Sequence, residues 1–77
     1  MEPKIVGEKV LELIKNNQIT IEDVAKKIGI KNKELHKKLE GKEEFYISEI
    51  IALTKLFNLD IDECIKTFFY EEKATLK

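Results

Sequence analysis

The sequence of 77 residues has no arginine, one cysteine, one proline and one histidine. No apolar run approaches the roughly 20 residues of a membrane-spanning helix, and Met1 to Lys4 lack the apolar stretch of a signal peptide. The single Cys64 excludes an internal disulfide and a zinc cluster. We therefore expect a cytoplasmic protein with no membrane partner.

The sequence also lacks a set of side chains that would support catalysis. The lone histidine, the lone cysteine and Ser48 lie far apart in the sequence, and Ser48 is placed to cap a helix. They do not form a nucleophile and its base. The acidic residues Asp60, Asp62 and Glu63 fit helix capping rather than a calcium loop. We expect no enzyme, no cofactor, no metal and no small-molecule ligand.

The length fits one small domain over residues 1–77, with a short tail from about residue 70. The apolar fraction of 43% is enough for a compact core. A domain of this size buries only about 60% of its unfolded surface, which keeps its stability modest.

The charge is unevenly distributed along the chain although its net value is only -1. Residues 26–42 hold seven Lys against two Glu, a local charge of +5, whereas residues 1–25 carry -2 and residues 43–77 carry -4. Counterion release rewards local positive charge, so the block suits an anionic partner. A solvated helix face is the alternative interpretation.

Apolar spacing and capping residues predict an all-α fold of five helices. The first runs from Pro3 to about residue 16 and ends at two asparagines. The second is capped by Thr20 and closed by Gly29, and the third extends over about residues 32–40. A fourth helix is capped by Ser48. Its expected inner residues are Ile50, Ile51, Leu53, Leu56 and Phe57. A fifth is capped by Asp60, and its expected inner residues are Ile61, Cys64, Ile65 and Phe68.

The second and third helices have the ingredients of a helix-turn-helix at about residues 20–40. Ala25 is small enough for a close helix crossing, and Gly29, four residues later, suits a left-handed turn. Leu35 is expected in the inward seam of the two helices, together with Val24, Ile28 and Ile30.

These residues resemble the Cro/CI-like helix-turn-helix family, also called XRE-like, over about residues 5–68. The matching segments are 19–30, 35–42, 48–50 and 57–63. The pattern is most similar to small regulators of phages and mobile elements in low-GC bacteria. The resemblance implies a compact lambda-repressor-like domain that binds double-stranded operator DNA as a homodimer. It also implies a transcriptional regulator, a repressor, with the third helix in the major groove.

Four residues are the candidates for reading bases. At 100° per residue, Lys33 and Lys37 lie opposite the apolar side of the third helix, with Asn32 and His36 alongside. Lysine can donate to guanine and asparagine can pair with adenine. Asn32 could instead cap the third helix, and His36 could instead be a solvated surface residue without a contact to DNA.

A second group is expected to contact DNA phosphates: Thr20, Lys31, Lys38, Lys42 and Tyr46. The positive end of the second helix forms an anion site at Thr20, and the long cations extend it. Tyr46 is otherwise a half-buried neighbour of Phe45. The chain departs from the family pattern at Ile21 and Glu40, where glutamine and asparagine are frequent. Without arginine, it also lacks bidentate planar recognition.

A protein-interaction module of the same fold, antitoxin-like or antirepressor-like, is the rival hypothesis. Its signature would be an exposed apolar patch, and Phe68, Phe69 and Tyr70 are the candidates. Phe68 is expected in the core. Phe69 and Tyr70 either cover the first helix or, together with residues 58–60, form the surface through which two copies associate.

Overall fold

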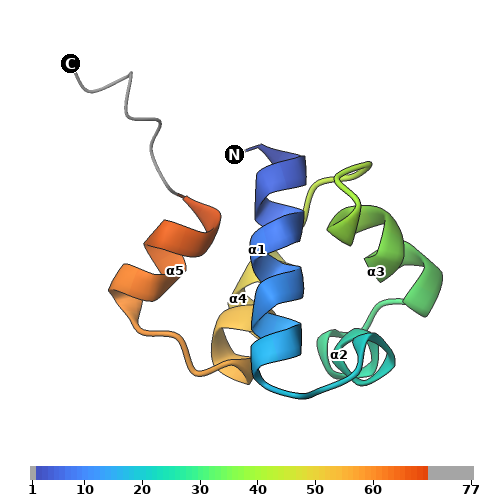
Figure 1. The fold of residues 1–77 in the computed structure, drawn as a ribbon, viewed down its shortest axis with the longest axis horizontal. Coiled ribbons are helices and arrows are strands. Elements are labelled where there is room, and N and C mark those ends of the chain that lie inside the picture. The colour runs from blue at the N-terminus through green and yellow to red at the C-terminus, as the bar shows by residue number, and fades with distance from the viewer. Residues whose placement is uncertain (1, 70–77) are drawn as a thin grey trace.

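The computed structural model describes residues 2–69, which fold into five helices and no strand. These are α1 (Pro3–Asn16), α2 (Ile21–Ile28), α3 (Asn32–Leu39), α4 (Ile47–Leu56) and α5 (Ile61–Phe68). Helix α1 runs through the middle of the molecule, with α5 on one side and α2 and α3 on the other (Figure 1). The all-α, five-helix prediction is confirmed. Tyr70 and the expected tail lie outside the described residues.

Most helix ends follow the predicted capping residues. The Thr20 hydroxyl accepts the Asp23 N–H at 3.0 Å and so begins α2. Asp60 and Glu63 form a reciprocal pair at the start of α5, in which each carboxylate accepts the other residue's N–H, at 2.8 and 3.0 Å. These side chains satisfy N–H groups that the first turn of a helix leaves without a carbonyl partner.

The predicted Ser48 cap is wrong. Helix α4 begins at Ile47, with Tyr46 in the capping position, so Ser48 already lies within the first turn and is exposed. The Tyr46 N–H is instead accepted by the Glu49 carboxylate at 2.9 Å. The start of α4 is therefore held by a carboxylate on its third residue rather than by a hydroxyl in the capping position.

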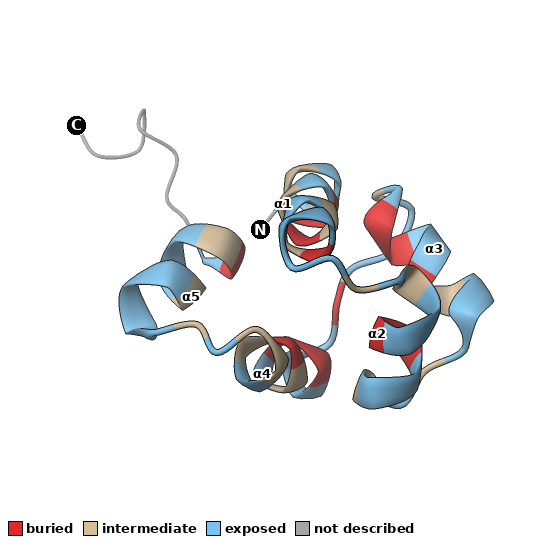
Figure 2. Ribbon diagram, turned by 60° about the horizontal axis from the view of Figure 1, so that its bottom comes forward, coloured by how far each residue is buried: buried red, intermediate tan, exposed pale blue. Residues whose placement is uncertain are grey.

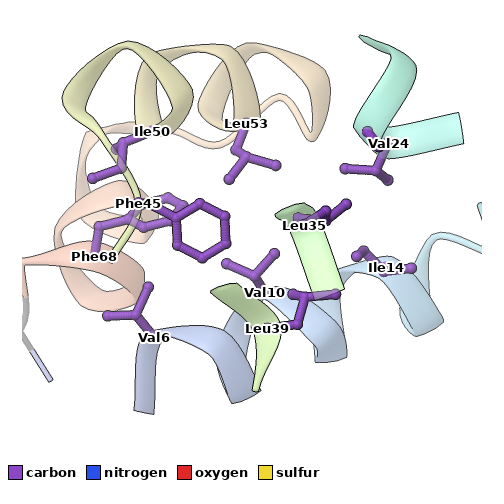
Figure 3. Close-up of a cluster of buried hydrophobic side chains, with 11 residues drawn as sticks. Val6, Val10, Ile14, Val24, Leu35, Leu39, Phe45, Ile50, Leu53 and Phe68 are labelled. Atoms are coloured by element: carbon purple, nitrogen blue, oxygen red, sulfur yellow. The ribbon is translucent and has the colours of Figure 1, made fainter. Parts of the chain in front are cut away.

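The core lies between the helices and is built from one side of each (Figure 2). Val10, Leu35 and Leu53 come from different helices and point toward one another, and Phe45 enters from the connection between α3 and α4 (Figure 3). The other buried apolar residues are Val6, Ile14, Val24, Ala25, Leu39, Ile50 and Phe68. At about 25 cal/mol for each Å² of apolar surface removed from water, this cluster is the main source of stability.

The expected inner faces of the last two helices are only partly correct. In α5, Phe68 is fully buried and Cys64 partly so, but Ile61 and Ile65 are 75% and 48% exposed. In α4, Ile51 is 51% exposed. Helix α5 packs against α1, so the side of α5 that faces away from α1 lies uncovered although its residues are apolar.

Helix α1 approaches the end of α3 so closely that only glycine fits at two points. A Cβ at Gly7 would lie 2.4 Å from the Leu39 carbonyl oxygen, and a Cβ at Gly41 would lie 2.7 Å from Lys4 Cα. Both obstacles are backbone atoms, which a side-chain rotation cannot relieve. Gly7 thus has a packing role that its unfavourable helix propensity does not suggest.

We expect Gly7→Ala to destabilise the domain by about 1–3 kcal/mol, because the added methyl must push α1 away from α3. In a solvated helix the same change would stabilise the protein by about 1 kcal/mol. Thermal unfolding measures the difference, and Glu8→Ala, at the exposed neighbouring position, is the matched control. A higher Tm for Gly7→Ala than for the wild type would show that the close approach is absent.

Candidate nucleic-acid interface

Helices α2 and α3 are joined by a tight left-handed turn. Gly29 has φ +80° and ψ +30°, and the N–H groups of Gly29 and Ile30 both donate to the Ala25 carbonyl, at 2.9 and 3.0 Å. The predicted left-handed glycine is confirmed. Lys31 follows in an extended conformation, and α3 begins at Asn32.

The seam between the two helices is apolar, as predicted. Val24, Ala25 and Leu35 are buried, and Ile28 and Ile30 pack against the same cluster. Ala25 is 2% exposed, and α2 packs against α3. A larger side chain at this buried position would have to displace its neighbours.

The opposite side of α3 is polar and open to solvent. Asn32, Lys33, His36 and Lys37 are all exposed, whereas Leu35 and Leu39 are buried on the inner side. Asn32 is the first residue of α3 rather than its cap, which is Lys31. The structure therefore places the four candidate base-reading residues on one accessible helix face, with their side chains available to a ligand.

The residues expected at phosphates are exposed as well, with one exception. Thr20, Lys31, Lys42 and Tyr46 are exposed. Tyr46 is 66% exposed and is therefore not the half-buried neighbour of Phe45. The Lys42 ammonium lies 3.1 Å from the Glu40 carboxylate, but both side chains are mostly exposed, and such a pair contributes little.

Lys38 is the exception, and its predicted phosphate contact is corrected. Its side chain is 1% exposed, and Nζ lies 2.7 Å from the Glu49 Oε1 atom. Lys38 follows Leu35 by three residues, which puts it at the edge of the buried face. An ammonium enclosed in this way is not available to a phosphate group.

Sequence reasoning missed Glu49, the partner of Lys38. Its side chain is 6% exposed, and Oε1 accepts hydrogen bonds from both Lys38 Nζ and the Tyr46 N–H, at 2.7 and 2.9 Å. A signal was present, because Glu49 is the one acidic residue in the mostly apolar sequence of α4. A carboxylate in the first turn of a helix is also a common capping residue, so this signal alone did not indicate burial beside a cation.

The rest of the described chain offers few alternatives to this surface. Residues 2–69 contain no helix that is long and apolar enough to cross a bilayer, and no group of His, Cys, Asp and Glu side chains that would hold a metal ion. Cys64 is partly buried, with Sγ 3.4 Å from the Thr54 hydroxyl.

Helices α2 and α3 are short and are joined by a turn that contains a left-handed glycine, and α3 exposes a polar and basic face. These features define a helix-turn-helix domain. A model of the Cro/C1-type HTH DNA-binding domain matches residues 9–69, most of the chain. The protein belongs to this family, whose domains bind DNA. The chain has no significant match among curated proteins or among solved structures.

We expect Gly29→Val to destabilise the domain by about 1–2 kcal/mol or more, since a β-branched residue is strained at positive φ. No atom lies within 4 Å of a Cβ at this position, so the loss would come from backbone strain alone. Gly29→Asn is the matched control, because asparagine tolerates the left-handed conformation. Equal thermal unfolding midpoints for the two variants would contradict the strain argument.

Proposed function

We propose that the protein is a sequence-specific regulator of transcription, a repressor, that inserts α3 into the major groove of operator DNA. The observation that carries the proposal is the exposed polar face of α3, which holds two lysines, one asparagine and one histidine opposite a buried leucine pair. The major groove admits a helix of this kind and offers a distinct donor and acceptor pattern for each base pair.

The proposed contacts divide into two kinds. Asn32, Lys33, His36 and Lys37 face the base edges, where lysine donates to guanine and asparagine pairs with adenine. Thr20, Lys31, Lys42 and Tyr46, which are also exposed, contact phosphates and so fix the position of α3 on the duplex. Repression suits such a surface, because occupying the operator is sufficient to block other proteins there.

The absence of arginine shapes how bases are read. Lysine is a compact charge without the planar fork that grips guanine in a fixed geometry. Discrimination then depends on several lysine and asparagine contacts together, and on the shape of the duplex. This favours a binding site that is read by two copies of the protein rather than one.

We further propose that two copies bind the operator as a symmetric dimer through an apolar patch on α4 and α5. The patch consists of Ile47, Ile51, Ile61, Ile65 and Phe69, all exposed. Phe69 connects its two halves, because it lines a groove with Ile47 and Ile51 and another with Ile61 and Ile65. The expected surface at residues 58–60 and Phe69 is thereby extended to α4 and α5.

A second copy suits this patch for reasons of symmetry. A two-fold interface places the same surface against itself, so it must be self-complementary. The patch has an apolar centre, and its grooves are bordered by Lys55 on one side and Asp60 on the other. Opposite charges at the two edges can pair across the two-fold axis while the isoleucines pack at the centre.

Selection of bound duplexes from a random pool tests the proposed function. We expect a motif with two half-sites whose centres lie about 10–10.5 base pairs apart, one turn of DNA. A pool that returns no motif would contradict DNA recognition and would favour the protein-interaction module.

Alanine variants test the division of contacts. Lys33→Ala and Lys37→Ala are expected to weaken binding to the selected duplex by about 5- to 150-fold, the value of a good base contact, and to affect random duplexes less. Lys42→Ala is expected to weaken both alike and to lower the salt slope by about one unit. Lys15→Ala, at an exposed site on α1, is the control. Equal losses on both duplexes for all variants would refute the division.

The dimer is tested by stoichiometry on the selected duplex. We expect two copies per operator for the wild type and for Ile65→Val, which keeps the patch apolar. Ile65→Glu, which places a charge on an exposed position and so spares the core, is expected to weaken binding and to favour one copy per duplex. One wild-type copy with an asymmetric footprint would refute the dimer.

A further inference from the structure

We propose that the buried ion pair of Lys38 and Glu49 positions α3 for DNA recognition. In this role it sets the direction in which α3 presents Lys33 and Lys37, without itself touching DNA. The inference rests on the proposed function and adds two positioning residues to it.

One carboxylate oxygen joins three parts of the chain. Glu49 Oε1 in the first turn of α4 accepts from Lys38 Nζ in the last turn of α3, at 2.7 Å, and from the Tyr46 N–H at 2.9 Å. The two side chains are 1% and 6% exposed. The end of α3, the start of α4 and the segment between them are therefore held by a single shared acceptor.

Two aromatic rings enclose the ammonium group. Lys38 Nζ lies 4.1 Å from the centre of the Tyr46 ring and 5.9 Å from that of Phe45. Both distances fall within the range of attraction between a cation and the face of a ring. Tyr46 thus has one side against Lys38 and the other toward solvent, so the same pair fixes the place of a proposed phosphate contact.

Direction is the property that this pair adds to the packing. Leu35 and Leu39 hold α3 against the core, but the hydrophobic effect that drives their burial is itself non-directional. A hydrogen-bonded ion pair has a narrow range of geometries. Lys38 follows Lys37 directly in the sequence, so holding the Lys38 side chain constrains the rotation of α3 and with it the direction in which the Lys37 side chain leaves the helix.

A role in stability alone is a weaker explanation. Taking two charges out of water offsets most of their attraction, and buried ion pairs are often replaced by uncharged side chains without loss of stability. The Lys42 and Glu40 pair lies nearby but is largely exposed, and it leaves the helix direction unconstrained. A rotation or shift of α3 would break the buried contact between Lys38 and Glu49, whereas it would cost little at the exposed pair.

The test uses the double variant Lys38→Met/Glu49→Gln in the full chain. Methionine keeps the length of the lysine stem, and the new amide oxygen at position 49 can still accept the Tyr46 N–H. We expect a folded protein with a Tm close to the wild type. Its affinity for the selected duplex should fall by about tenfold, the scale of one base contact, with affinity for random duplexes and the salt slope unchanged.

Two controls separate positioning from other roles. Lys15→Met removes one positive charge from an exposed site on α1 and should leave the operator preference intact. A second charge-free pair, Lys38→Leu/Glu49→Gln, also leaves no unpaired buried charge and should lower the operator preference in the same direction. It keeps the test decisive if the methionine-containing pair does not fold.

Three results would overturn the inference. Unchanged operator preference in both variants would leave the pair with a stabilising role only. Equal loss on all duplexes, with the salt slope lowered by about one unit, would mean that Lys38 contacts phosphate directly. Failure of the wild type to select any operator would instead refute the proposed function on which the inference rests, and it is recognised before any variant is made.

Discussion

The contact of α1 with the end of α3 is the constraint on which the exposed face of α3, our proposed DNA-binding surface, depends. Helix α3 has eight residues, and isolated helices shorter than about 12–15 residues are marginal in water. It is therefore stable only where it is docked. Gly7 lets α1 reach the Leu39 carbonyl, and Gly41 lets the chain leave α3 beside Lys4. Any side chain at those points would move α3, and with it every residue that faces solvent from its outer side.

The docked helix α3 has one apolar, buried side and one polar, exposed side. Leu35 and Leu39 are buried in the core, and Lys33 and Lys37 are exposed to solvent. The domain thereby concentrates positive charge on one face while its net charge is only -1. Because surface charges are screened over about 8–10 Å in physiological salt, the acidic residues elsewhere weaken this local field only slightly.

The sequence predicted most local features, with the Ser48 cap as an exception, but predicted non-local ones poorly. The bounds of α1 and α2, the Thr20 cap and the left-handed Gly29 depend on neighbouring residues, and all were predicted. Lys38 and Glu49 lie eleven residues apart on different helices, so no helical periodicity relates them. Ile61 and Ile65 show a second limit. An apolar stripe has the same spacing whether it faces the core or lies open to solvent, and only the packing of α5 against α1 decides which side is covered.

The lysines of α3 differ in their exposure to water: Lys33 and Lys37 are exposed, and Lys38 is buried. Lys33 and Lys37 keep their hydration until a ligand displaces it, so their interactions depend on salt and on the partner. Lys38 has lost its hydration already and has Glu49 and two aromatic rings in its place. Adjacent lysines of one helix thus differ in accessibility. The composition of α3 shows its charge, and only the fold shows which of those charges a second molecule can reach.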